Sequence, residues 1–460
     1  MSVRRLSDLA AATGGTLQGE DREFTRVTQD SRKLGQGDLF IAIKGENFDG
    51  HDFLSQAEKS GAAGALVERR RSTALPQVLV PDVRKALGAY AAVWRRRFAL
   101  PLVGVTGSSG KTTLKEMIAS ILRQRGATLA TRGNMNNDIG MPLTLLELDA
   151  SDRYAVIEMG TNHPGEIEYL ARLALPSVSV VTNAGPAHLE FLKDVAGVAR
   201  EKGAIFSCLA AGGVAVINAD DAHARLWREM AGARKTVTFG FGEQADFHPL
   251  PGVLRQSESG SWQFHLVSPQ GETDVNVSLP GRHNVANALA AAAAAMSAGA
   301  SLDDVRAGLA AAPATAGRLI VIPGQNGSRL IDDSYNANPL SLSAAIEFAM
   351  SLSGRSWLVL GDMGELGDSA VRLHAESGAR ARSLGIERLY ALGEHSRHAV
   401  EAFGSGARWF EDVNSLVRAL LTDAGVGVTL LVKGSRSMRM ERVVDALRSQ
   451  PAARAANGDH

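Results

Sequence analysis

The chain has 460 residues, of which 45% are hydrophobic and 21% are charged, as in globular proteins with buried cores. Its 49 basic and 49 acidic residues cancel, which argues against binding to nucleic acid or to a membrane surface. The single cysteine, Cys208, excludes a disulfide framework within the chain and a zinc site built on thiolates.

The apolar segments bear on the location of the protein. The N-terminal residues lack the apolar run of a signal peptide, and the longest apolar stretch, residues 288–298, is too short to span a bilayer. We therefore expect a cytoplasmic protein without a membrane span, and we expect it to act as a monomer. At roughly 150 residues per domain, a chain of this length is expected to form about three domains.

Residues 1–98 are predicted to form a small α/β domain. Short strand-like runs alternate with helix-like segments, and glycine and aspartate residues mark the turns between them. The predicted strands are 38–43, 65–68 and 77–81, and the predicted helices are 51–59 and 83–98.

Residues 99–313 alternate more strongly between strand and helix, which predicts a parallel sheet covered on both faces. Residues 245–280 are rich in turn residues and predict an antiparallel excursion. The predicted strands are 102–105, 154–159, 178–182, 214–218 and 236–240, and the clearest helices are 111–124, 283–298 and 301–312.

Residues 314–460 follow a hinge-like segment at 313–317 and predict a third, Rossmann-like α/β domain. Its first strand is not followed by a G-x-G-x-x-G motif, so we predict no dinucleotide site. The tail from Pro451 is expected to be disordered. The predicted strands are 319–322, 329–332, 357–360, 388–391 and 429–433, and the predicted helices are 341–352, 371–384, 413–423 and 440–449.

A glycine-rich loop between the strand at 102–105 and the helix at 111–124 is typical of phosphate binding. Glycines let the backbone wrap a phosphate group, and the loop N–H groups and the helix N-terminus face its negative charge. Lys111 would neutralise the β and γ oxygens of ATP, and the Thr112 hydroxyl would bind Mg²⁺. A chance turn before an ordinary helix is the alternative. The predicted loop is Thr106, Gly107, Ser108, Ser109, Gly110, Lys111, Thr112 and Thr113.

Two polar residues follow successive strands beyond this loop. Glu158 ends one apolar strand, and His188 follows the next, so both are expected at the same edge of the sheet. Each alone is consistent with a helix cap, an ion pair or a loop histidine, but together they indicate a metal and triphosphate site. The nearby Asn136 and Asn137 are consistent with a turn or with a polar ligand.

These motifs occur in the order found in the Mur ligases, and the sequence resembles that family over nearly its whole length. The resemblance rests on the phosphate loop, Asn136-Asn137-x-x-Gly140, Glu158-Met159-Gly160, Asn183-x-x-x-x-His188 and Gly281-Arg282-His283-Asn284-x-x-Asn287. Family members use ATP to activate a carboxylate as an acyl phosphate, which an amine then attacks.

The resemblance implies roles for individual residues. Lys111 and Thr112 would hold the phosphates and one Mg²⁺ together with Glu158, and His188 would serve a second Mg²⁺. Lys202 matches a lysine that is carbamylated in related ligases, where the carbamate supplies oxygens to the metal. Asn287 would contact adenine, Asp333 the ribose and Arg318 the γ-phosphate.

The third domain contains Asp332-Asp333-Ser334-Tyr335-Asn336-Ala337-Asn338-Pro339, Gly361-Asp362-Met363-Gly364-Glu365-Leu366-Gly367 and Lys433-Gly434-Ser435-Arg436. These segments resemble those of the family members that add D-alanyl-D-alanine to UDP-N-acetylmuramoyl-tripeptide. The segment containing Ser31 and Arg32 resembles the part that holds the UDP end, and Asn136 and Asn137 would contact the substrate. The dipeptide would be held by Tyr335, Asn336, Asn338, Lys433, Ser435 and Arg436. For residues 433–436 the alternative is a solvated strand end. A sibling ligase with another amine, a folate polyglutamate synthase and a nucleotide-hydrolysing switch remain alternatives for the whole chain.

Overall fold

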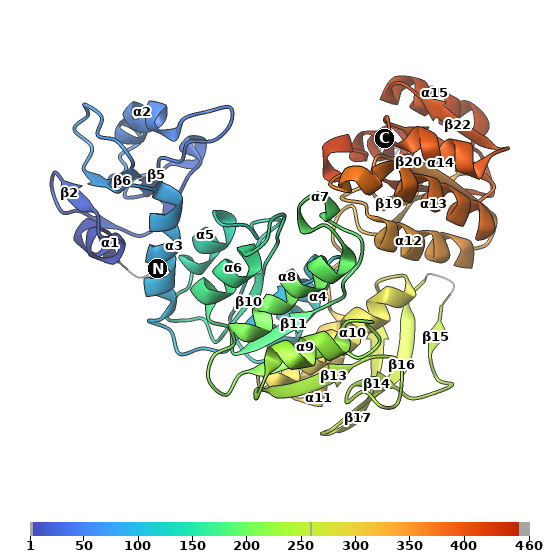
Figure 1. Ribbon diagram of the computed structural model, residues 1–460, viewed down its shortest axis with the longest axis horizontal. Coiled ribbons are helices and arrows are strands. Elements are labelled where there is room, and N and C mark those ends of the chain that lie inside the picture. Colours follow the sequence, from blue (N-terminus) through green and yellow to red (C-terminus); the bar gives the residue numbers. More distant parts are fainter. Residues whose placement is uncertain (1–2, 258–259, 450–460) are drawn as a thin grey trace, which may run out of the picture.

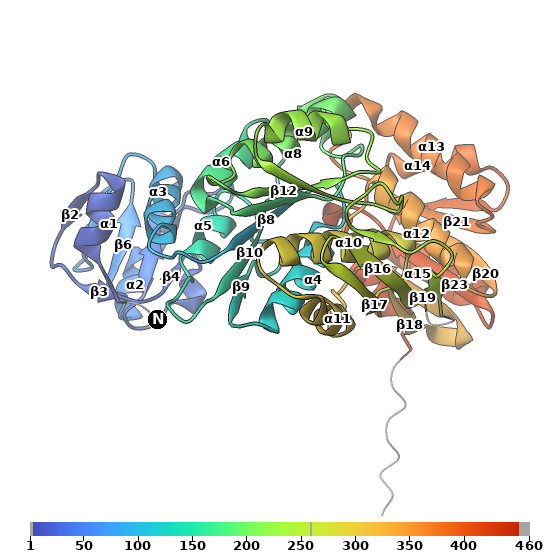
Figure 2. The same cartoon turned by 90° about the horizontal axis from the view of Figure 1, so that it is seen from below.

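The structure is a computed structural model that describes residues 3–257 and 260–449, so the tail from Pro451 lies outside the described residues. It contains a mainly parallel sheet in each of three successive parts of the chain, with helices packed against the strands. In Figures 1 and 2 the N-terminal and C-terminal units lie at opposite ends of the central unit. The predicted α/β class is confirmed, whereas the boundaries at residues 98 and 313 stay predictions.

The N-terminal unit has a five-stranded sheet with the order β2-β7-β6-β5-β4, parallel except where β2 pairs with β7. A separate antiparallel pair joins β1 to β3. Its elements are β1 (Arg4–Arg5), α1 (Leu6–Thr13), β2 (Thr16–Gln18), β3 (Glu23–Phe24), β4 (Val27–Thr28), β5 (Leu39–Ile41), α2 (Leu54–Lys59), β6 (Gly64–Val67), β7 (Gln77–Leu79) and α3 (Val83–Arg95).

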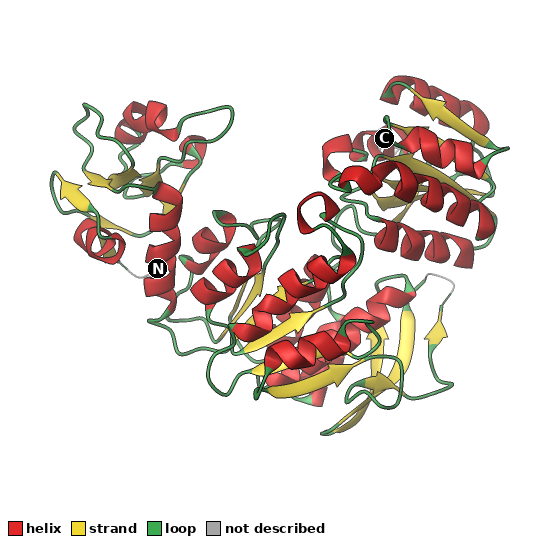
Figure 3. Ribbon diagram, in the orientation of Figure 1, coloured by secondary structure: helices red, strands yellow, loops and turns green. Residues whose placement is uncertain are grey.

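The central unit has a six-stranded, fully parallel sheet with the order β13-β12-β11-β8-β10-β9. Helices cover both of its faces (Figure 3). Its elements are β8 (Leu102–Thr106), α4 (Lys111–Arg123), β9 (Thr128–Ala130), α5 (Gly140–Leu145), β10 (Tyr154–Glu158), α6 (Glu166–Ala174), β11 (Val178–Val181), α7 (Leu189–Leu192), α8 (Val195–Ser207), β12 (Val214–Asn218), α9 (Ala224–Ala231), β13 (Lys235–Phe239), α10 (Arg282–Ser297) and α11 (Leu302–Ala310).

Alternate residues of the central strands enter two separate cores, as the two-residue period of a strand requires. Leu102 and Ile217 belong to one core, while Val103 and Val216 belong to the other. The alanine-rich helix α10 lies in the second core, with every residue from Ala288 to Ala295 buried. Small side chains let this helix approach the sheet and α4 closely. Among the described residues, no helix combines the length and apolar character needed to cross a membrane.

The predicted antiparallel excursion is confirmed. Four strands, β14 (His248–Pro249), β15 (Arg255–Gln256), β16 (Trp262–Ser268) and β17 (Gly271–Val277), form a sheet whose pairings are all antiparallel.

The C-terminal unit has a six-stranded sheet with the order β18-β19-β23-β20-β21-β22, in which only the β18–β19 pairing is antiparallel among the described strands. The sequence did not predict β22 or α14, because both are short and interrupted by exposed charged residues. Its elements are β18 (Ile320–Pro323), β19 (Arg329–Asp333), α12 (Pro339–Ser351), β20 (Arg355–Gly361), α13 (Ala370–Ser383), β21 (Arg388–Leu392), α14 (Ser396–Phe403), β22 (Ala407–Phe410), α15 (Val413–Asp423), β23 (Val428–Lys433) and α16 (Glu441–Leu447).

Both faces of the central sheet are buried, so shortening one of its side chains should destabilise the protein. Ile217 of β12 is fully buried, so Ile217→Ala should lower the free energy of unfolding by about 2–5 kcal/mol through lost burial and a cavity. The thermal unfolding midpoint, followed by circular dichroism, should fall accordingly. Val426→Ala is the control, because Val426 is 82% exposed. Equal midpoints for the two variants would contradict the assignment of Ile217 to the core.

Candidate active site

The phosphate loop (residues 106–113) connects β8 to α4, and its backbone wraps the Lys111 side chain. Lys111 Nζ donates to the Gly107 carbonyl at 2.8 Å. Gly107 and Gly110 have φ angles of +149° and +83°, which favour glycine. A Cβ at Gly107 would lie 1.8 Å from Thr182 Oγ1, and one at Gly110 would lie 2.8 Å from Asn287 Oδ1. Both glycines are therefore required by conformation and by space.

The end of the neighbouring strand β11 holds this loop in place. The Asn183 carbonyl accepts from Ser108 N, and Asn183 Oδ1 accepts from Ser109 N, both at 3.0 Å. The Thr182 hydroxyl donates to the Ser109 carbonyl at 2.6 Å. No role was predicted for Thr182 or Asn183 from the sequence, although Asn183 opens the motif Asn183-x-x-x-x-His188. Their position directly after a strand that neighbours β8 was the signal that could have found them.

Glu158 ends β10 on the other side of β8 and is 2% exposed. Asn136 Nδ2 donates to Glu158 Oε1 at 2.7 Å, whereas Glu158 Oε2 has no hydrogen-bond partner in the described part of the chain. Burial lowers the pKa of Lys111, and the negative charge of Glu158 opposes that shift. The loop lysine and the strand-end carboxylate therefore share one buried electrostatic environment.

His188 precedes α7 in a left-handed conformation, with φ at +56°. Its Nδ1 lies 2.5 Å from Oε2 of Glu365, which comes from the C-terminal unit. Burial is the main cause that lowers the pKa of His188, and contact with His188 is the main cause that lowers the pKa of Glu365. Glu365 lies in Gly361-Asp362-Met363-Gly364-Glu365-Leu366-Gly367, and no role was predicted for it from the sequence.

Lys202 lies within α8 and is fully buried, and its Nζ has no hydrogen-bond partner among the described residues. Burial and the positive charge of Lys111 lower the pKa of Lys202 well below its ordinary value. Within residues 3–257 and 260–449, no cluster of three or more His, Cys, Asp or Glu side chains is arranged to hold a metal ion. A metal here would need ligands of other kinds in addition to Glu158 and His188.

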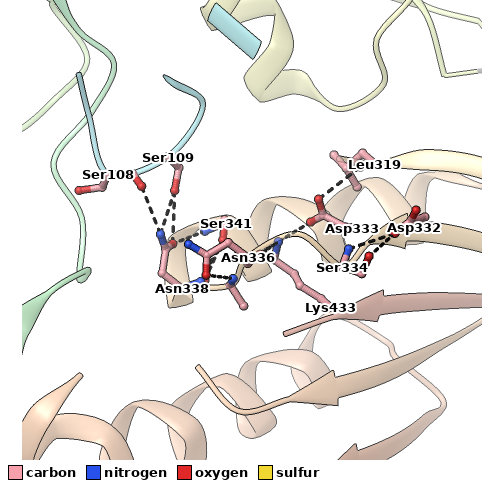
Figure 4. Close-up of polar contacts among 11 residues, drawn as sticks. Ser108, Ser109, Leu319, Asp332, Asp333, Ser334, Asn336, Asn338, Ser341 and Lys433 are labelled. Atoms are coloured by element: carbon pink, nitrogen blue, oxygen red, sulfur yellow. Dashed lines mark hydrogen bonds and ion pairs between the residues drawn. The ribbon is translucent and has the colours of Figure 1, made fainter. Parts of the chain in front are cut away.

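The C-terminal unit reaches the phosphate loop through two side chains. Arg318 Nη2 donates to Thr112 Oγ1 at 3.0 Å, and its guanidinium carbon lies 4.4 Å from the centre of the Tyr335 ring. Asn338 Nδ2 donates to Ser109 Oγ at 3.1 Å, while Asn338 Oδ1 caps α12 (Figure 4). Both contacts join residues that are far apart in the sequence.

Asp333 and Lys433 form a buried ion pair at the carboxyl ends of β19 and β23 (Figure 4). Lys433 Nζ also donates to the Asn336 carbonyl at 2.9 Å, and Asp333 Oδ1 accepts from Leu319 N at 3.2 Å. Burial raises the pKa of Asp333, and the charge of Lys433 opposes that shift. Asp333, which was predicted to contact the ribose, is therefore paired with Lys433, which was predicted to contact the dipeptide.

A cavity of about 950 Å³ brings most of the predicted residues together, and Glu46 and Arg84 of the N-terminal unit also line it. Burial and the charge of Lys433 lower the pKa of His283, an unpredicted lining residue, to about 4. The predicted residues that line the cavity are Ser108, Ser109, Gly110, Lys111, Thr112, Thr113, Asn136, Asn137, Glu158, His188, Asn287, Arg318, Asp333, Tyr335, Asn336, Asn338, Lys433, Ser435 and Arg436.

Five predicted residues do not line this cavity. Thr106 and Gly107 lie behind the loop surface, and Lys202 is buried beside the site. Ser31 and Arg32 lie in a short 3₁₀ helix of the N-terminal unit, where the exposed Arg32 side chain pairs with Asp30 at 2.8 Å.

The chain matches three family models in succession. They are the catalytic domain of the Mur ligase family at residues 23–101, the Mur ligase middle domain at residues 105–295, and the glutamate ligase domain of Mur ligases at residues 317–436. The chain is also 45% identical over 445 residues to the UDP-N-acetylmuramoyl-tripeptide–D-alanyl-D-alanine ligase of Escherichia coli K12, covering 96% of this chain and 98% of that protein.

Solved structures agree with these matches. A crystal structure of MurF from Acinetobacter baumannii is similar with a TM-score of 0.91 and 37% identity, covering 97% of this chain and 98% of that one. MurF from Thermotoga maritima, solved in complex with ADP, has a TM-score of 0.81 and 30% identity, covering 92% and 96%. The resemblance inferred from the motifs is confirmed. The chain therefore belongs to the Mur ligase family.

Proposed function

We propose that this protein is an ATP-dependent ligase that joins D-alanyl-D-alanine to UDP-N-acetylmuramoyl-tripeptide in peptidoglycan precursor synthesis, through an acyl-phosphate intermediate. The observation that carries the proposal is the single cavity lined by the phosphate loop, Glu158 and the strand-end loops of the C-terminal unit. The identity to the Escherichia coli ligase supports these substrates.

The charges around the phosphate loop suit the formation of an acyl phosphate. The acceptor carboxylate and the triphosphate are both anions, so their approach is opposed by electrostatic repulsion. Lys111 and Arg318 line the cavity and would offset that repulsion while the phosphoryl group is transferred. Asn287, which lies beside Gly110, is proposed to contact adenine, and Asp333 the ribose.

The residues present also fit a divalent cation. Glu158 Oε2 is a buried carboxylate oxygen that lacks a partner among the described residues, and carboxylate oxygens are preferred ligands of Mg²⁺. We propose that Glu158 and Thr112 would hold one ion and that His188 would serve a second. When bound, these ions would supply positive charge that neutralises the phosphate oxygens.

Lys202 is proposed to be carbamylated in the active enzyme. Its buried amine has a lowered pKa, so a neutral form is available to add to carbon dioxide, with the released proton passing to solvent. The product is an anionic carbamate whose oxygens extend beyond the position of Nζ. An ammonium group at this place could not act as a metal ligand.

The two cations proposed for the dipeptide carboxylate differ in availability. Arg436 pairs with Glu441 at 3.0 Å, and its side chain is 57% exposed, so exchanging that partner costs only about 0–1 kcal/mol. Lys433 is buried against Asp333, and breaking such a pair costs about 3–5 kcal/mol. We therefore propose that Arg436 and Ser435 receive the carboxylate while Lys433 holds Asp333 in position.

The remaining substrate groups are assigned as follows. Tyr335, Asn336 and Asn338 are proposed to contact the dipeptide, Asn136 and Asn137 the acceptor peptide, and Ser31 and Arg32 the UDP end. One chain supplies all of these residues, so we propose that a monomer suffices. We also propose a cytoplasmic location, where ATP is available.

The proposed substrates predict how the reaction rate depends on the amine that is supplied. With ATP and UDP-N-acetylmuramoyl-tripeptide, phosphate release and product formation should be fastest with D-alanyl-D-alanine. The panel would include D-alanine, D-glutamate, L-lysine and diaminopimelate, measured by coupled phosphate release and mass spectrometry of the product. Faster coupling of a single amino acid would replace the proposal by a sibling ligase, and phosphate release that needs neither carboxylate nor amine would favour a switch.

The position of Lys111 in the phosphate loop predicts that Lys111→Ala abolishes turnover without unfolding the protein. Removing one group that stabilises transition-state charge commonly costs a factor of about 10²–10³ in rate. Phosphate release at saturating ATP measures the loss, and circular dichroism checks the fold. Retention of most wild-type activity would refute the assignment of this loop.

The carbamate proposal predicts that Lys202→Ala loses activity and regains part of it when acetate or another short carboxylate is added. Arg200→Ala is the control, because Arg200 lies on the same helix with an exposed side chain. Carbon-13 NMR with labelled bicarbonate should detect the carbamate in the wild type and not in Lys202→Ala. Full activity of the variant, or a wild type without the carbamate signal, would refute the proposal.

A further inference from the structure

The attacking amine poses a binding requirement that the residues assigned so far do not meet. A dipeptide is a zwitterion near neutral pH, so its ammonium group needs a negative partner close to the reacting centre. The C-terminal unit, where the proposed function puts the amine, contributes Glu365 to the cavity. Its carboxylate lies 2.5 Å from His188, beside the phosphate loop.

The loop between β20 and α13 is fixed so that Glu365 faces the central unit. Glu365 adopts φ +61°, which is uncommon for a residue with a side chain. Its carbonyl accepts from Glu190 N at 3.3 Å, and the next residue, Leu366, is 2% exposed in a core shared with Leu189 and Leu192 of α7. The side chain of Glu365 is nonetheless 44% exposed, so a ligand can reach it.

Three other carboxylates that line the cavity are already engaged, while Glu158 is proposed above to hold the cation. Asp333 is buried against Lys433, and Asp138 pairs with Arg84 at 3.5 Å. Glu166 accepts from the backbone N–H groups of Asn162 and His163 at 2.7 and 3.1 Å. The ion-pair contact of Glu365 is with one nitrogen of His188, and 44% of the Glu365 side chain is exposed. The carboxylate therefore has room for a second, cationic partner.

A positive group lies on the adjacent loop of the same sheet. The loop containing Glu365 follows β20, the loop containing Arg436 follows β23, and these two strands pair in parallel. Ser435 N donates to the Asp362 carbonyl at 2.9 Å, which ties the two loops together. An extended dipeptide spans about 7 Å, a length suited to bridging groups on neighbouring loops.

We propose that Glu365 is a substrate-binding residue that holds the ammonium group of the incoming dipeptide beside the acyl phosphate, while Arg436 holds the dipeptide carboxylate. The ammonium group loses one proton, to Glu365 or to water, before its nitrogen forms the C–N bond and phosphate leaves. The inference rests on the proposed function and adds a specificity-determining residue to it. In this arrangement the two ends of a zwitterion meet opposite charges, with the negative group on one loop and the positive group on the next.

The test separates formation of the acyl phosphate from its capture by the dipeptide. Hydroxylamine is uncharged near neutral pH and converts an acyl phosphate to a hydroxamate, forming a C–N bond as phosphate leaves. Glu365→Gln should raise the KM for D-alanyl-D-alanine by about 10- to 100-fold, as expected for one lost charge-assisted bond. The KM for ATP and the rate of hydroxamate formation should stay near wild type. Glu365→Asp, which keeps the charge, should recover part of the KM.

Glu190→Gln is the matched control, because Glu190 is an exposed carboxylate on α7 beside the same loop and does not line the cavity. Equal losses of hydroxamate and peptide formation in Glu365→Gln would overturn the proposal, since Glu365 would then act through His188 on the ATP step. An unchanged KM for the dipeptide would also overturn it. A wild type that forms no hydroxamate from ATP and UDP-N-acetylmuramoyl-tripeptide would instead refute the proposed function, and this inference with it.

Discussion

Parallel pairing of β8 with β10 and β11 is the constraint on which the site depends. In this register Glu158 lies opposite Val105, and Val181 lies opposite Thr106, so the three strands end together. In a parallel sheet the carboxyl ends of all strands lie at the same edge. The loops that follow neighbouring strands therefore meet there. The phosphate loop, the Glu158 carboxylate and the Thr182-Asn183 turn are adjacent for this reason, although they come from different stretches of the sequence.

Several buried charged groups lie at this edge of the sheet, and some of their polar atoms lack a hydrogen-bond partner among the described residues. Lys111 uses a backbone carbonyl, one oxygen of Glu158 is satisfied by Asn136, and Lys202 has no partner among the described residues. Burying charged groups without partners is costly, so such groups persist where a ligand compensates them. Such a site is suited to a highly charged ligand.

Besides an apolar core that includes Leu189 and Leu366, polar contacts around the cavity join the C-terminal unit to the central one. Arg318 bonds to Thr112, Asn338 bonds to the phosphate loop, and Glu365 pairs with His188. Each of these contacts involves a residue proposed to bind a ligand or its direct neighbour. A ligand that bonds to one residue of such a pair breaks the contact between the two units. Ligand binding in the cavity and the position of the C-terminal unit are therefore linked.

Local sequence determined much of this protein. Hydrophobic periodicity predicted the main strands of the central sheet, and the glycine, lysine and threonine pattern predicted the phosphate loop, because both signals lie within a few consecutive residues. The short strands β9 and β22 were missed, since their apolar runs are too brief to show a period.

Tertiary structure alone decided the pairing of Lys433 with Asp333 and of Glu365 with His188. Lys433 looked suited to a substrate carboxylate, yet it is buried against Asp333 on the neighbouring strand. Glu365 had no assigned role until the fold set it against His188. Such partners are separated by a hundred residues or more, as in the 100 residues between Asp333 and Lys433, and only the packing of sheets and loops brings them within a few ångströms.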